Sequence, residues 1–266
     1  MSPDSPLFDP QINTEYMPSQ RVPDAASYWE AWGPRSAAVR AEYPPQELSY
    51  GTGPRERLDV FEPTGTARAT LLFIHGGYWV AFDKEDFSYV APPLLGAGVR
   101  VAVVSYDLAP AVSLRQMVRQ VRQAASFVSQ RFGPLLVAGH SAGGHLAAMT
   151  HCTDWAAEGL PAPQLVGGIG ISGLYDLGPL RHTEVQADLQ LSAAEARALS
   201  PVHHPPSTGA PFVAALGELE SAAFYWQADQ LAAAWRGVAS APLPLPQRHH
   251  FDAPEDLLGL TLPLLP

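Results

Sequence analysis

Short apolar segments alternate with segments of helical periodicity from residue 58 onward, and this alternation limits the folds open to the chain. Apolar runs that end near glycine or proline are typical of strands buried in a parallel sheet. Strands are predicted over residues 58–63, 69–77, 99–110, 134–139, 164–172 and 211–218, with a last one within 241–247. Helices are predicted after Ser113, after Ser141, and over residues 193–199 and 221–236. This order predicts an α/β protein with a mostly parallel central sheet covered by helices on both faces, and it puts functional groups at the carboxyl ends of the strands.

Residues 1–50 differ in composition from the rest of the chain. They are rich in proline, serine and polar residues, apart from an aromatic patch at Tyr28, Trp29 and Trp32. We interpret this segment as an N-terminal arm that packs on the catalytic domain, which we assign to residues 51–266. We find no internal repeat and no long linker that would divide the chain further.

The charge balance limits the partners of the chain. The formal net charge of −10 argues against a nucleic-acid partner. No apolar run approaches the roughly 18 residues of a membrane span, and the first residues carry no secretory signal. We therefore expect a cytoplasmic protein that acts on a small-molecule substrate, without a nucleic-acid or membrane partner.

Metal-binding patterns are missing from the sequence. Cys152 is the single cysteine, so an internal disulfide and a cysteine-based zinc cluster are both excluded. No H-E-x-x-H or comparable histidine spacing occurs. We expect no metal and no cofactor.

The segment Gly139-His140-Ser141-Ala142-Gly143 matches the pattern G-x-S-x-G between a predicted strand and a predicted helix. In that setting the turn is so sharp that only glycine fits two residues before and after the serine, whose hydroxyl then projects from the sheet. Ser141 is the predicted nucleophile. The amide groups at the start of the following helix, first that of Ala142, can stabilise a developing oxyanion.

A second glycine loop, His75-Gly76-Gly77-Tyr78-Trp79, follows a predicted strand upstream of the serine. Glycine exposes backbone amides that can donate to a carbonyl oxygen as it gains negative charge. The amides of Gly77 and Tyr78, with that of Ala142, are the predicted oxyanion hole, and Gly76 shapes the turn. His75 fits a structural role in this loop better than a catalytic one.

The acid and the base are expected after the serine, in that order. Glu218 and Glu220 both follow the predicted strand 211–218, and we favour Glu220 because it lies further into the loop, where it can reach an imidazole. His249 and His250 follow the last predicted strand. Adjacent side chains point in different directions, so only one of these two histidines can face Ser141.

These motifs resemble those of the kynurenine formamidases (arylformamidases) of the α/β-hydrolase type, which are related to the hormone-sensitive-lipase-like esterases. The resemblance covers residues 15 to about 256. It rests on HGGYW (75–79), GHSAGGHLA (139–147), GELES (217–221) and HHFD (249–252), and on EYMPSQRVPD (15–24), SGLYDLGPL (172–180) and ARALSP (196–201). It implies an α/β-hydrolase fold. It also implies that the catalytic histidine precedes a phenylalanine, which is His250, and that the acid is Glu220, where many relatives have aspartate.

The resemblance further implies metal-independent hydrolysis of N-formyl-L-kynurenine to L-kynurenine and formate in tryptophan breakdown, through a Ser-His-Glu triad. A formyl group needs little room, whereas the aromatic leaving group needs a slot, for which Tyr78 and Trp79 are the candidate wall. A general carboxylesterase acting on short-chain or aryl esters would use the same triad and is the alternative. A non-catalytic binding protein with this fold is a third possibility, which the complete set of serine, acid and histidine argues against.

Overall fold

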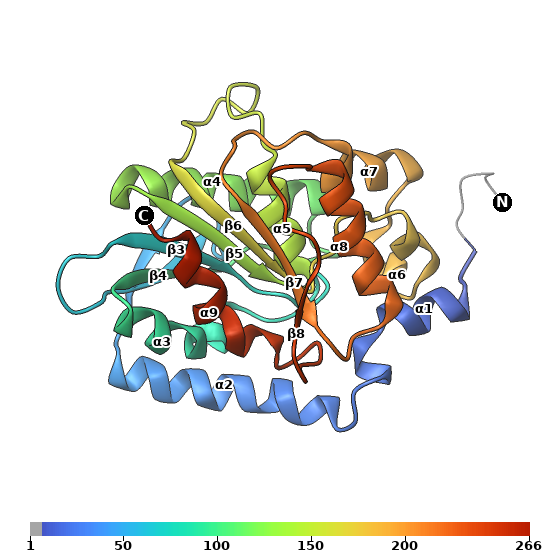
Figure 1. Ribbon diagram of the computed structural model, residues 1–266, viewed down its shortest axis with the longest axis horizontal. Coiled ribbons are helices and arrows are strands. Elements are labelled where there is room, and N and C mark those ends of the chain that lie inside the picture. Colours follow the sequence, from blue (N-terminus) through green and yellow to red (C-terminus); the bar gives the residue numbers. More distant parts are fainter. Residues whose placement is uncertain (1–6) are drawn as a thin grey trace.

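The computed structural model describes residues 7–266, and one eight-stranded sheet runs through this part of the chain (Figure 1). The strand order is β1-β2-β4-β3-β5-β6-β7-β8. The strands are β1 (Gln46–Ser49), β2 (Arg57–Phe61), β3 (Ala69–Ile74), β4 (Val99–Val104), β5 (Leu135–His140), β6 (Leu165–Ile171), β7 (Phe212–Gly217) and β8 (Leu243–Leu245). β1 and β2 are antiparallel to their neighbours, and all pairs from β4 to β8 are parallel. The predicted mostly parallel sheet is confirmed.

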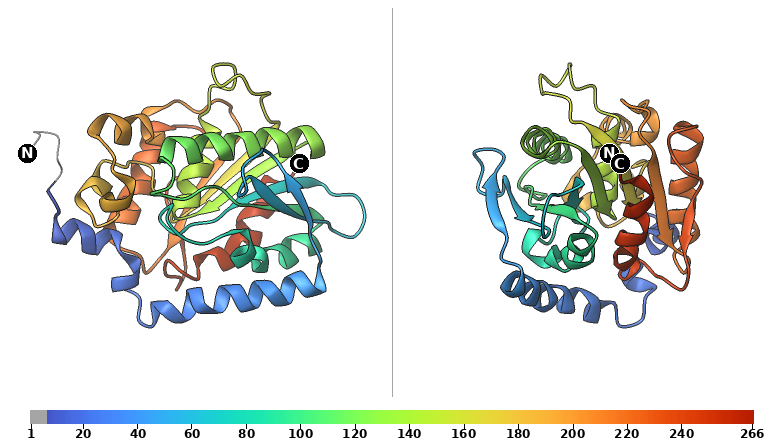
Figure 2. Two further views of the ribbon diagram at one scale, coloured as in Figure 1. Left: turned by 180° about the vertical axis from the view of Figure 1, so that it is seen from behind. Right: turned by 60° about the vertical axis from the view of Figure 1, so that its left-hand side comes forward.

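Helices cover both faces of this sheet. They are α1 (Pro10–Tyr16), α2 (Ala25–Glu42), α3 (Ala91–Gly96), α4 (Leu114–Phe132), α5 (Ala142–His151), α6 (Gln186–Leu189), α7 (Ala193–Ala198), α8 (Ala222–Ala234) and α9 (Leu257–Thr261). Residues of α4, α5 and α8 share one core with alternate residues of β3 such as Leu72 and Ile74, and α4 crosses the face seen from behind in Figure 2. Residues of α2, α3 and α9 share the core on the other face with Leu71 and Phe73. Because successive side chains of β3 point to opposite faces of the sheet, this strand contributes residues to both cores.

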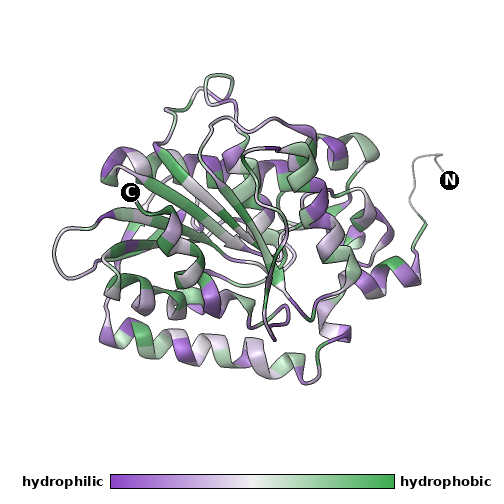
Figure 3. Ribbon diagram, viewed as in Figure 1, coloured by the Kyte–Doolittle hydropathy of each residue, from purple (hydrophilic) through white to green (hydrophobic). Residues whose placement is uncertain are grey.

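The longest surface helix of the second face, α2, is an element that the sequence analysis did not predict. Its 18 residues carry no apolar stripe, and Figure 3 shows hydrophilic and hydrophobic residues mixed along it. Gly33 and Pro34 lie in its interior, where both residue types disfavour a helix. Tertiary contacts hold α2 instead, because Trp32 packs among Phe82, Phe87, Tyr89 and Phe251, all with ring centroids within 6.4 Å of its own.

Polar contacts also join α2 to the body of the protein. The Ser36 hydroxyl donates to the carbonyl of Asp86 (2.8 Å) and accepts from the amide of Tyr89 (3.2 Å). Arg40 pairs with Asp59, a fully buried residue of β2 whose Oδ2 also lies 3.3 Å from Nζ of the buried Lys84. Two cations from different elements therefore meet one buried carboxylate.

Among the helices of residues 7–266, none combines the length and the apolar character that a membrane span needs.

The buried carboxylate of Asp59 gives a first prediction. Asp59→Asn should lower the free energy of unfolding by about 3 kcal/mol, because it removes the buried negative charge that faces Arg40 and Lys84 and leaves Arg40 without its acidic partner, while Lys84 keeps Glu47 and Glu85. The matched control is Glu62→Gln. Glu62 makes a half-exposed pair with Arg100 (2.7 Å), and its loss should change stability by no more than about 0.5 kcal/mol. Urea unfolding of the three proteins measures both values, and equal effects of the two substitutions would contradict the prediction.

Candidate active site

Ser141 lies at the turn between β5 and α5, in a backbone conformation that serine rarely adopts. Its φ is 55° and its ψ is −119°, and its amide donates to the carbonyl of Ile171 (2.8 Å). A Cβ at Gly139 would overlap the carbonyl of Gly143, and a Cβ at Gly143 would overlap the carbonyl of Ile74. The two glycines therefore allow β5, α5 and the end of β3 to meet, and the strained turn at Ser141 is the result.

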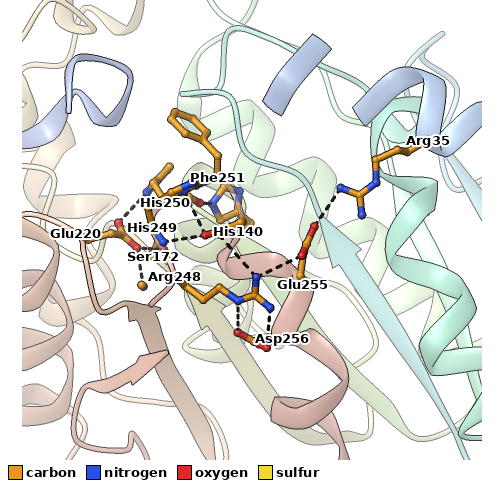
Figure 4. A network of polar contacts seen from close by, with 12 residues as sticks. Arg35, His140, Ser172, Glu220, Arg248, His249, His250, Phe251, Glu255 and Asp256 are labelled. Atoms are coloured by element: carbon orange, nitrogen blue, oxygen red, sulfur yellow. Dashed lines mark hydrogen bonds and ion pairs between the residues drawn. The ribbon is translucent and has the colours of Figure 1, made fainter. Parts of the chain in front are cut away.

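His250 and Glu220 are brought together by loops that follow β8 and β7. His250 Nδ1 lies 2.8 Å from Glu220 Oε2, and both side chains are almost fully buried (Figure 4). Glu220 Oε1 accepts from the Ser172 hydroxyl and from the amide of Gly217 (2.8 Å). Every oxygen of this carboxylate is thus occupied, which fixes it as an acceptor for the imidazole N–H.

Glu218 and His249 occupy different surroundings. Glu218 is exposed, and its Oε2 accepts from the amide of Gln247 (2.8 Å) at the surface. His249 Nδ1 lies 3.2 Å from Asp252 Oδ1, and its ring packs edge-on against Tyr28. Neither residue lines the pocket that contains Ser141.

The glycine loop His75–Trp79, which is the predicted oxyanion loop, folds back against the turn Gly139–Gly143, here called the elbow. Gly77, Tyr78 and Trp79 all have positive φ angles, of 96°, 49° and 61°. A Cβ at Gly76 would lie 2.9 Å from the carbonyl of His140 and 3.1 Å from the Ser141 Cβ, so the missing side chain is what lets the loop approach. Within residues 7–266 the amides of Gly77, Tyr78 and Ala142 donate no hydrogen bond. They are thus available to an anion near Ser141.

A pocket of about 390 Å³ opens above Ser141. Its lining residues are Pro18, Ser19, Trp29, Trp32, Gly77, Tyr78, Val80, Ala81, Phe82, Phe87, His140, Ser141, His250 and Phe251. The wall is mainly aromatic and carries no acidic or basic residue other than the two histidines. Its largest rings come from α2 and from the segment after Val80, not from the oxyanion loop alone. A larger open groove of about 840 Å³ runs along α4, but neither Ser141 nor His250 lines it.

The expectation that Trp79 forms a wall of the substrate slot is wrong. Trp79 is fully buried and does not line the pocket, and its ring packs edge-on against His145 with centroids 5.1 Å apart. The positive φ of Trp79 turns its side chain into the core beneath the loop. Tyr78 does line the pocket, and its hydroxyl donates to the carbonyl of Tyr16.

Other buried histidines have structural contacts. The His75 ring stacks on Tyr106 (4.4 Å), and burial lowers the pKa of His75 to about 4. His145 Nε2 lies 2.7 Å from the carbonyl of Leu199, and burial lowers its pKa to about 4 as well. Burial raises the pKa of the Cys152 thiol to about 12, which keeps it protonated and poorly nucleophilic. No group of three or more potential metal ligands occurs among the residues that the structure describes.

Sequence reasoning missed several residues that shape the site. Ser172 gave a weak signal, since a lone serine in SGLYDL has no spacing that links it to an acid 48 residues later. Trp29 and Trp32 stood out as an aromatic patch, but their helix lacked periodicity, so their place in the pocket was not foreseen. His140 fills the variable position of G-x-S-x-G, where the pattern assigns no role.

Comparison with known proteins identifies relatives that match between half and most of the chain. The α/β hydrolase fold family matches residues 71–207. The kynurenine formamidase of Salmo salar is 35% identical over 224 residues, or 79% of this chain and 76% of that protein. That of Drosophila melanogaster is 33% identical over 52% of this chain and 48% of its own. A crystal structure from Silicibacter sp. TM1040, of a protein provisionally described as a thioesterase, has 34% identity and a TM-score of 0.86, covering 93% of this chain and 95% of that chain.

The contact at Gly143 gives a second prediction. Gly143→Ala should lower the free energy of unfolding by about 3 kcal/mol, because the new Cβ overlaps the carbonyl of Ile74 at the end of a buried strand. Gly259→Ala is the control, since its new Cβ meets nothing within 4 Å and it lies in the helix α9. That change should stabilise the protein by about 0.5 kcal/mol. Thermal and urea unfolding measure both, and a neutral Gly143→Ala would contradict the packing argument.

Proposed function

Since the chain belongs to the kynurenine formamidase family of α/β hydrolases, we propose that it hydrolyses N-formyl-L-kynurenine to L-kynurenine and formate. The observation that carries the proposal is the buried contact of 2.8 Å between His250 Nδ1 and Glu220 Oε2, made beside the pocket that Ser141 lines. A carboxylate bound to Nδ1 leaves Nε2 of the same ring free to accept a proton. Ser141, His250 and Glu220 are then the nucleophile, the base and the acid.

The first half of the reaction forms a formyl-enzyme. Ser141 Oγ attacks the formyl carbon and gives its proton to His250 Nε2. The carbonyl oxygen becomes an oxyanion that accepts hydrogen bonds from the amides of Gly77, Tyr78 and Ala142. The C–N bond then breaks, and the departing aromatic amine takes the proton from His250.

The second half releases formate. A water molecule attacks the formyl-serine carbon and gives a proton to His250, and the same three amides stabilise the second oxyanion. The bond to Ser141 Oγ breaks, and Oγ recovers its proton from His250. The Glu220 carboxylate accepts the hydrogen bond from His250 Nδ1 throughout and stabilises the imidazolium that forms in each half.

The shape and chemistry of the pocket support an aromatic leaving group. The rings of Trp29, Phe82 and Phe251 offer apolar area to an aryl ring, while the small formyl hydrogen needs no acyl pocket beside the oxyanion loop. The same lining favours a second candidate function, the hydrolysis of uncharged aryl or short-chain esters. Apart from the two histidines, it has no ionisable acidic or basic group that would select the amino-acid part of N-formylkynurenine.

The assignment of the acid and the base gives a third prediction. Ser141→Ala, Glu220→Gln and His250→Ala should each lower kcat by at least about 10³-fold, because the members of such a triad act as a unit. Glu218→Gln and His249→Ala are the matched controls, and each should stay within about threefold of wild type, since neither side chain reaches the pocket. A fluorophosphonate should label wild type and fail to label Ser141→Ala. If Glu218→Gln proved more damaging than Glu220→Gln, the proposed acid would be wrong.

The substrate assignment gives a fourth prediction. The kcat/KM for N-formylkynurenine should exceed that for a formylated aliphatic amine by at least about 100-fold, because an aniline is the better leaving group and its ring buries apolar area. It should also exceed the kcat/KM for nitrophenyl butyrate, whose longer acyl chain must fit beside the oxyanion loop. Steady-state kinetics on the three substrates measures this order. A preference for the butyrate ester would instead support the esterase function.

A further inference from the structure

His140, the last residue of β5, joins the strand that carries the nucleophile to the loop that carries the base. Its side chain is almost fully buried, and its Nε2 lies 2.8 Å from the carbonyl oxygen of His250 (Figure 4). The rings of His140 and His250 have centroids 4.8 Å apart. The two residues are 110 positions apart in the chain, so this contact is one that the fold has to build.

The contact with the His250 carbonyl defines which nitrogen of the His140 ring carries the proton. A carbonyl oxygen only accepts hydrogen bonds, so Nε2 carries the proton and Nδ1 of the neutral ring is bare. Nδ1 is buried without a partner in the described chain, and it faces the oxyanion loop, where a Cβ at Gly76 would lie 3.3 Å away. Burial, and then the neighbouring His250, lower the pKa of His140 well below its ordinary value. The ring is therefore neutral whenever the enzyme is folded at ordinary pH.

The main chain of His250 has little other support. His250 lies in a turn outside any helix or strand, and in residues 7–266 its amide donates no hydrogen bond. Its carbonyl accepts one hydrogen bond there, that from His140. The Glu220 contact fixes one edge of the His250 ring, but Glu220 makes no hydrogen bond to the peptide that carries this ring.

We propose that His140 is a positioning residue that holds the His250 main chain through its Nε2–H and so sets the reach of the His250 ring to Ser141. The proposal rests on the proposed roles of Ser141 and His250. A cationic donor at this place would oppose the positive charge that His250 gains in each half of the reaction, since the rings are 4.8 Å apart. A neutral, buried imidazole provides the hydrogen bond without that repulsion.

Two variants of similar size separate the hydrogen bond from packing. His140→Leu fills the space but has no donor, whereas the amide nitrogen of His140→Gln reaches about as far as Nε2 and can donate to the same carbonyl. We expect His140→Leu to lower kcat by about 30-fold with KM within about threefold, because a small displacement of a catalytic group slows the chemical step. His140→Gln should stay within about fivefold of wild type in kcat. The assay is turnover of nitrophenyl acetate together with the rate of fluorophosphonate labelling at Ser141.

The outcomes distinguish this proposal from the proposed function. If wild type is labelled and turns over the ester but His140→Leu equals wild type, or His140→Gln loses as much kcat as His140→Leu, the positioning role is overturned. The same holds if the loss appears in KM alone. If wild type itself is not labelled, the serine mechanism fails first. If His140→Leu does not fold, His140→Asn takes its place, because its amide is one methylene too short to reach the His250 carbonyl. The proposal then requires the kcat of His140→Asn to lie well below that of His140→Gln.

Discussion

The first turn of α5 lies directly against the ends of β3 and β5, and the rest of the site depends on the space that missing side chains leave at this contact. Gly139 and Gly143 allow the backbones to meet, and Ser141 between them has a positive φ. The same approach brings Gly76, and with it the oxyanion loop, against the carbonyl of His140. Ser141 and the amides of Gly77, Tyr78 and Ala142 are thus positioned by backbone packing, whereas Glu220 and His250 are held by side-chain contacts.

The elements of the sheet could be predicted from the sequence because their signals are local. A buried strand such as β5 is a short apolar run that ends near a glycine, and α4 is capped by Ser113, whose hydroxyl accepts from the amide of Gln116 (3.3 Å). Each predicted strand and helix from residue 58 onward has a counterpart in the structure with bounds within about three residues, except that the strand predicted over 99–110 is too long and ends at Val104. The helix α2 lacked a local signal, because contacts of Trp32 and Arg40 with distant residues hold it in place.

The candidate site likewise has one part with local sequence signals and another part that depends on long-range contacts. The elbow and the HGGYW loop are contiguous motifs, so their residues could be named in advance. The sharing of Glu220 between Ser172 and His250, and the bond from His140 to His250, join residues 30 to 110 positions apart, for which one sequence offers no spacing rule. Trp79 was misjudged for a different reason. Its backbone has a positive φ and its side chain lies in the core, and residue type alone reveals neither.

The pocket closes between the two ends of the chain. Trp29 from α2 meets Phe251 with ring centroids 5.5 Å apart, and Arg35 pairs with Glu255 (3.1 Å). During synthesis the turn at Ser141 therefore emerges long before His250, and Trp29 stays uncovered until Phe251 has been made. A chain cut before residue 249 keeps Ser141 but lacks His250 and Phe251, and the pocket above Ser141 then has no wall on that side.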